Sequence, residues 1–175
     1  MEEPTVILVP AGYGHPRHRL VIRALMERTP SSLLVDCRLV PRSRWPAWSQ
    51  PALQRDYDQR YQHVPALGNR RYRVRGQIEI VDLQAGVQQV VRAVVQGRRQ
   101  VLILLCGCAQ EQHCHRRLIV PALEEALQRA GVFTWKLVPE QWAAHGGLVS
   151  GLVKGGKEQG KTIPRLSKEE PHEQS

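Results

Sequence analysis

Two runs of apolar residues, Thr5–Val9 and Val101–Leu105, constrain the fold more than any other feature of this sequence. Neither run alternates apolar with polar side chains, as a strand with one wet face does, so each fits a strand that is covered on both faces. Two further strands are predicted at Leu33–Asp36 and Phe133–Val138. Strands of this kind are typical of a parallel sheet that lies between two layers of helices.

Helical periodicity fills the intervals between these strands. A helix is predicted from Pro16 to about Thr29, and its proline occupies a first-turn position where no N–H is needed. A second helical stripe ends at Gly97, and a third helix continues to about Ala130. This order predicts an α/β fold, a three-layer Rossmann-like sandwich with right-handed crossovers and a mostly parallel sheet of about four strands.

The chain is long enough for one domain with a substantial core. We predict a single α/β domain over residues 1–145, with a long insertion at about 41–75 after the second strand and a short helix near Pro51–Tyr57. Insertions of this length are usually sites or lids. Residues 146–175 are dominated by Gly, Lys, Glu, Gln and Pro, which predicts a disordered tail.

Charge and cysteine content indicate the class of partner and the compartment. The chain has 25 Lys and Arg against 16 Asp and Glu, a net charge of +9 that favours phosphate-bearing or polyanionic partners. A basic protein without any nucleic-acid role is an equal alternative. The N-terminus lacks the apolar stretch of a secretory signal, and no apolar run is long enough for a membrane span. Four cysteines, three of them within nine residues, favour thiol or metal chemistry in the cytoplasm.

Three polar segments follow the predicted strands, namely Gly12–His15, Asp36–Arg38 and Cys106–Cys114. The carboxyl ends of parallel strands meet at one edge of a sheet, where open α/β sheets bind their ligands. We therefore expect all three segments to form one site. The third also leads into a helix, whose first turn offers free N–H groups and a partial positive charge to an anion.

The same segments carry a resemblance to a known family. The chain resembles the DUF488 family over roughly Val6 to Val138, a widespread group of small, mostly prokaryotic proteins of uncharacterised function. The family usually has an acidic residue two positions after the first cysteine, where this chain has Cys108. The resemblance implies a Rossmann-like domain with a polar pocket at the strand ends, without an established reaction. The matching elements are Gly14-His15, Val35-Asp-Cys-Arg-Leu-Val-Pro-Arg-Ser-Arg44, Leu67-Gly68, and Leu105-Cys106 with Cys114-His115-Arg116.

Our leading hypothesis is a phosphate-bearing ligand, a nucleotide or a nucleic-acid end, bound at this edge. Arg38 and Arg116 would hold the anion. Ser43 is expected either to contact the ligand or to cap its own loop. The predicted ligand-contacting residues are Gly14, His15, Arg38, Ser43, Gly68 and Arg116.

The candidate catalytic residues are Asp36, Cys106, Cys114 and His115. Asp36 is either a general base or the partner of Arg38 in an ion pair that fixes the insertion. Cys106 is either a nucleophile or a small buried residue, and Cys114 with His115 could form a thiolate–imidazole pair. No arginine follows Cys106 or Cys108 by five or six residues, which excludes the loop of cysteine phosphatases. Without a Gly-x-Gly-x-x-Gly segment, a transferase or hydrolase is favoured over a dehydrogenase, and whether the chain is an enzyme stays open.

Two other hypotheses use neighbouring residues. A metal or redox sensor would use Cys106, Cys108, Cys114 and His115, but zinc sites usually draw a second ligand pair from another segment, so no metal is expected and no cofactor is indicated. Trp45 and Trp48 could form a stacking wall over the pocket or anchor the insertion. A non-enzymatic nucleic-acid-binding module, or else a solvated basic face, would use Arg70, Arg71, Arg73 and Arg75 beside tyrosines.

Overall fold

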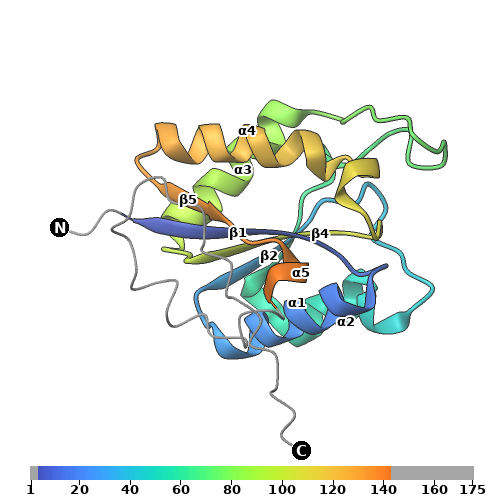
Figure 1. Ribbon diagram of the computed structural model, residues 1–175, viewed down its shortest axis with the longest axis horizontal. Coiled ribbons are helices and arrows are strands. Elements are labelled where there is room, and N and C mark those ends of the chain that lie inside the picture. The colour runs from blue at the N-terminus through green and yellow to red at the C-terminus, as the bar shows by residue number, and fades with distance from the viewer. Residues whose placement is uncertain (1–3, 143–175) are drawn as a thin grey trace, which may run out of the picture.

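The computed structural model describes residues 4–142, which form one parallel five-stranded sheet between two layers of helices (Figure 1). This confirms the predicted α/β sandwich. The sheet has one strand more than expected, because β3 arises inside the segment 41–75 that was predicted as an insertion. In the spatial order β3-β2-β4-β1-β5, the strands are β1 (Thr5–Gly12), β2 (Ser32–Asp36), β3 (Tyr61–His63), β4 (Val101–Cys106) and β5 (Phe133–Lys136).

The helices cover the sheet from both sides (Figure 1). α3 (Leu83–Gln96) and α4 (Arg116–Arg129) pack on one face. The other face carries α1 (Pro16–Arg28), α2 (Gln50–Tyr57) and the short α5 (Pro139–Trp142). The predicted helix near the start of the insertion is confirmed by α2.

The central strand β4 shows why its sequence is apolar throughout. Leu102 and Leu104 belong to the core that includes side chains of α3 and α4, whereas Ile103 and Leu105 belong to the core that includes α1. Successive side chains of a strand point to opposite faces, so a strand covered on both sides needs apolar residues at every position. Polar side chains are thereby excluded from the middle of the sheet and gather where the strands end.

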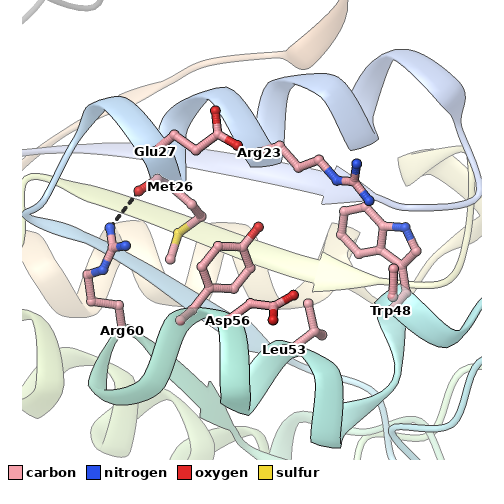
Figure 2. Close-up of a pocket in the computed structure, with 9 residues that line it drawn as sticks. Arg23, Met26, Glu27, Trp48, Leu53, Asp56 and Arg60 are labelled. Atoms are coloured by element: carbon pink, nitrogen blue, oxygen red, sulfur yellow. Dashed lines mark hydrogen bonds between the residues drawn. The ribbon is translucent and has the colours of Figure 1, made fainter.

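The segment predicted as an insertion is built into the layers. Leu53 of α2 and Tyr61 of β3 are both buried in the core on the α1 side of the sheet. A hollow of about 440 Å³ separates α1 from α2, with Arg23 and Trp48 among its lining side chains (Figure 2). The segment therefore extends the sheet and the helical layer together.

The longest described helices, α3 and α4, have 14 residues each. Such a helix spans about 21 Å at 1.5 Å per residue, less than the roughly 30 Å of a bilayer core. Among residues 4–142, no helix is long and apolar enough to cross a membrane. The predicted domain end at residue 145 and the predicted tail lie outside the described residues.

Replacing Leu104 tests the role of β4 in the core. Leu104→Ala should lower the free energy of unfolding by about 2–5 kcal/mol, because the side chain is fully buried and leaves a cavity. Leu20→Ala on α1, where the side chain is 70% exposed, should change it by no more than about 0.5 kcal/mol. Chemical denaturation measures both values, and equal effects would contradict the assignment of β4 as the centre of the sheet.

Candidate functional site

The carboxyl ends of β1, β2 and β4 bring the three predicted polar segments to one edge of the sheet. The N–H of Tyr13, just after β1, donates to the carbonyl oxygen of Cys106 at 3.0 Å. The N–H of Cys37, just after β2, donates to the carbonyl oxygen of Leu105, also at 3.0 Å. Backbone pairing therefore fixes where the side chains of all three segments begin.

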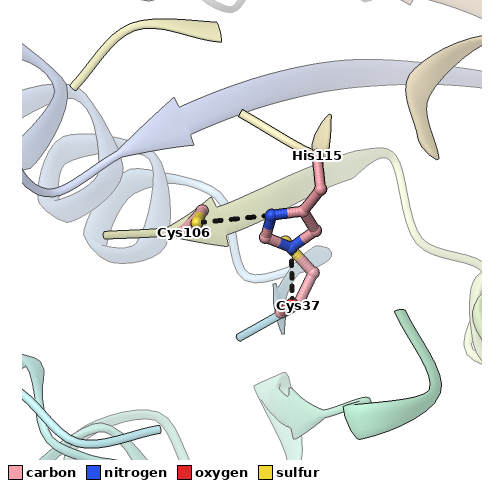
Figure 3. A group of neighbouring side chains, drawn as sticks. All are labelled: Cys37, Cys106 and His115. Atoms are coloured by element: carbon pink, nitrogen blue, oxygen red, sulfur yellow. Dashed lines mark hydrogen bonds between the residues drawn. The ribbon is translucent and has the colours of Figure 1, made fainter. Parts of the chain in front are cut away.

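Four cysteines, a histidine and an arginine gather at these ends and are called the strand-end cluster: Cys37, Cys106, Cys108, Cys114, His115 and Arg116. His115 Nε2 lies 2.8 Å from the carbonyl oxygen of Cys37, which orients the ring so that Nδ1 faces the thiols (Figure 3). Nδ1 lies 3.9 Å from Cys106 Sγ and 3.6 Å from Cys114 Sγ. Cys106 Sγ is also 3.7 Å from Cys108 Sγ.

These contacts shift the pKa values of the cluster. Hydrogen bonds from the thiols of Cys108, Cys114 and Cys37 hold the pKa of Cys106 well below its usual range. Burial lowers the pKa of His115, but its contacts with Cys106 and Cys114 outweigh burial and raise it to about 10. The pKa of Cys108 is raised, chiefly by its hydrogen bond to Cys106. These pKa directions favour a thiolate at Cys106 beside a protonated His115.

Arg116, the first residue of α4, is fully buried in the cluster. Its Nε donates to Cys114 Sγ at 3.2 Å and its Nη2 to the carbonyl oxygen of Cys108 at 3.0 Å. No carboxylate among residues 4–142 forms an ion pair with it, and its Nη1 has no hydrogen-bond partner there. His15 Nδ1 is likewise buried without a partner. Polar groups of this kind are costly to bury unpaired.

The second predicted arginine, Arg38, is engaged elsewhere. Its Nε and Nη2 both donate to the Asp36 carboxylate, and its Nη1 donates to the carbonyl oxygen of Trp48 at 2.9 Å. The Tyr61 hydroxyl donates to the same carboxylate at 2.7 Å. Of the two alternatives for Asp36, this geometry favours the ion pair that fixes the insertion.

Arg38 and Arg116 have different partners in the structure, and the expectation that they hold one anion together stays a prediction. Arg38 lies among Tyr13, Trp48 and Tyr61, which belong to the core on the α1 side of the sheet. Arg116 donates to Cys114, which belongs to the core on the opposite side. Asp36 and Cys37 follow one another and point to opposite faces of the sheet, so the carboxylate partner of Arg38 lies on the α1 side.

Three of the predicted ligand-contacting residues occupy structural positions. Ser43 Oγ accepts a hydrogen bond from the N–H of Trp45 at 3.0 Å, the loop-capping alternative. A Cβ at Gly14 would lie 2.5 Å from the carbonyl oxygen of Gly107, and one at Gly68 would lie 2.6 Å from the Cα of Leu39. Both glycines allow two backbone segments to approach closely.

Sequence reasoning missed His18 of α1. Its Nδ1 accepts a hydrogen bond from the N–H of Gly12 at 3.0 Å, and its Nε2 lies 2.7 Å from Glu140 Oε1. The centre of its ring lies 4.5 Å from the centre of the His15 ring, three residues earlier in the chain. Burial lowers its pKa more than Glu140 raises it. The spacing of the two histidines was the signal that could have revealed it.

The thiols also match the donor set of a soft metal ion. The ligand atoms of Cys106, Cys108 and Cys114 lie within 4.8 Å of one another, as do those of Cys37, Cys106 and His115. Zinc takes sulfur and imidazole ligands of this kind. Metal analysis of the purified protein tests the sequence-based hypothesis of unmetallated thiols.

The arginines predicted to bind nucleic acid lie on the loop between η3 (Pro65–Leu67) and α3, and all four are exposed. Arg71 pairs with Glu79 at 3.0 Å, and Arg73 donates to the Tyr72 hydroxyl at 3.1 Å. Tyr61, one of the interleaved tyrosines, is buried and bound to Asp36. Few rings in this segment are therefore free to stack on a base.

Comparisons with known proteins give one match. A family model described as "Domain of unknown function DUF488" matches residues 19–123, more than half of the chain and including Asp36, Arg38 and the whole Cys106–Arg116 segment. No curated protein and no solved structure matches.

Removing Asp36 tests its structural role. Asp36→Ala should lower the free energy of unfolding by about 3–5 kcal/mol, because Arg38 would stay buried without a counter-ion. Glu79→Ala is the matched control, since its pair with Arg71 is exposed and should contribute less than about 1 kcal/mol. Urea denaturation of both variants compares the losses, and a similar small loss in each would argue against the ion pair as a fixing contact.

The charge on Cys106 can be observed directly. Titration followed by thiolate ultraviolet absorbance should show one thiol ionising well below the ordinary value of about 8.5. Cys106→Ser should remove this step. Cys108→Ser should keep it, because the serine hydroxyl can still donate to the thiolate. If the step survives in Cys106→Ser, the charge is assigned to the wrong sulfur.

Proposed function

The chain belongs to the DUF488 family, and from this premise we propose that it binds a phosphate-bearing ligand at the strand-end cluster and acts on it through the Cys106 thiolate. The ligand is a nucleotide or a nucleic-acid end, and the reaction is a group transfer or a hydrolysis. The single observation that carries the proposal is the buried guanidinium of Arg116, with Nη1 unpartnered and no carboxylate paired to it.

A buried arginine of this kind favours an anion over a neutral ligand. Its charge faces thiols and a carbonyl oxygen, which compensate it less fully than a carboxylate would. Phosphate oxygens accept charge-assisted hydrogen bonds from guanidinium groups. The start of α4 adds a partial positive charge at the same place.

The neighbouring thiol and imidazole supply the chemistry. Cys106 Sγ, at the end of β4, faces His115 Nδ1 at 3.9 Å, so that a thiolate nucleophile and a proton donor lie side by side. Cys106 is 5% exposed, and it touches the exposed thiol of Cys108. Among the buried thiols, Cys106 is therefore next to the exposed Cys108, on the side from which a ligand would approach.

The arginine in this arrangement comes from a helix start ten positions after the nucleophile. The short loop of cysteine phosphatases, which the spacing excludes, wraps around its anion. Here the tight contact between Gly14 and the loop after β4 closes the space beside the thiol instead.

Phosphate binding tests the proposal. Inorganic phosphate at about a hundred times its Kd should stabilise the wild type by about 2.7 kcal/mol in thermal unfolding. Arg116→Met should abolish this stabilisation, because the neutral side chain offers no donor. Arg117→Met is the matched control, since Arg117 is the next residue of α4 and is exposed.

Arg116→Lys guards against a folding defect, because it keeps the buried charge but not the unpartnered Nη1. Its phosphate affinity should fall by about tenfold while its circular dichroism stays that of the wild type. Phosphate stabilisation that is equal in the wild type and the Arg116 variants would refute the proposal, as would its absence in the wild type.

A further inference from the structure

A second surface feature lies apart from the strand-end cluster, on the side of the sheet covered by α1. A groove of about 470 Å³ runs between the first half of α1 and the turn that leads into η1 (Pro46–Trp48). Exposed Leu20 lies on its α1 side. Its main lining side chains are Arg19, Leu20, Arg23, Trp45, Pro46 and Trp48.

Guanidinium groups contact both indole rings of this groove, those of Arg19 and Arg23 from its lining and that of Arg44 from beside it. The guanidinium carbons of Arg19 and Arg44 each lie 4.9 Å from the centre of the Trp45 ring, and that of Arg23 lies 5.8 Å from the Trp48 ring. Within residues 4–142, none of these three arginines forms an ion pair with a carboxylate, in contrast to Arg55, Arg71 and Arg129. The groove is therefore rich in cationic and aromatic groups and has a surplus of positive charge.

We propose that this groove binds single-stranded nucleic acid, with a base stacked on Trp45 and backbone phosphates on Arg19, Arg23 and Arg44. Sites for single strands combine a positively charged groove with aromatic rings on which bases stack. A base that stacks on Trp45 displaces one of its two guanidiniums, which is then free to pair with a phosphate. An acidic peptide could use the arginines but has no flat group for the indole.

The two ends of the groove differ in charge, and this difference indicates which way the bound strand leaves the groove. Towards α2 the adjoining hollow carries Glu27 and Asp56 opposite Arg23, and these carboxylates repel a phosphate backbone (Figure 2). At the other end, Trp45 meets the ring of Tyr13 edge-on at 5.8 Å, and the backbone of Tyr13 is bonded to Cys106.

The Tyr13 end of the groove is the one nearer the strand-end cluster, because the backbone of Tyr13 pairs with that of Cys106. This direction rests on the proposed function and makes the end of a nucleic-acid strand its substrate class. Binding in the groove itself is independent of the cluster. The arginines predicted from the sequence on the 70–75 loop are not needed for it.

Fluorescence anisotropy with a labelled oligothymidylate that ends in hydroxyl groups tests the groove. The wild type should bind at low ionic strength, with affinity falling as salt increases. Trp45→Ala should weaken binding by about tenfold, the effect of losing one stacked base, and Trp45→Phe should keep most of the affinity. Arg19→Ala should weaken binding and reduce the salt slope by about 0.7, as expected for one lost phosphate contact.

The matched controls are Trp135→Ala on β5 and Arg92→Ala on α3, which are both exposed and do not line the groove. Neither should change the affinity. The proposal is overturned if the wild type does not bind, if Trp45→Ala binds as tightly as the wild type, or if duplex DNA or polyglutamate binds as well as the single strand. Trp45→Ala should keep the full stabilisation by inorganic phosphate, because Trp45 lines the groove and is not part of the strand-end cluster, so that failure of the phosphate site and failure of the groove are read separately.

Discussion

A parallel sheet that is covered on both faces leaves polar side chains no place except the ends of its strands, and this constraint organises the molecule. β4 provides the clearest case, because all six of its residues are buried and the chain becomes polar immediately after Cys106. The nine residues that follow, 107–115, lead into α4. Arg116 is thereby carried into the interior at the point where thiols and a helix start meet.

Much of this architecture could be predicted from the sequence because the signals are strong and local. The unbroken apolar runs at β1 and β4 predicted strands with two covered faces, and the structure buries both. Asp36 and Cys106 were expected at the same edge because each follows a predicted strand and all parallel strands end at one edge of the sheet. The DUF488 resemblance and the family match agree with this layout.

Other features depended on contacts that a linear pattern does not record. β3 has only three residues, too few to show a period, and pairs with β2 across an intervening helix. That Asp36 and Cys37 point to opposite faces could have been inferred, because neighbours on a strand do so, but the contacts of Arg38 with Tyr13 and Trp48 could not. The burial of Cys114, His115 and Arg116 could not be predicted either, because the same three residue types also occur in open clefts.

The short outer strands have a consequence for how copies of this chain behave beside one another. β3 and β5 form the two edges of the sheet, and they contain three and four residues. An edge strand has unpaired backbone N–H and C=O groups that can bind another extended chain, and a longer edge strand has more of them. Here an incoming segment gains only a few backbone bonds at either edge, so the protein can keep a wholly apolar sheet centre without recruiting neighbours into intermolecular β-structure.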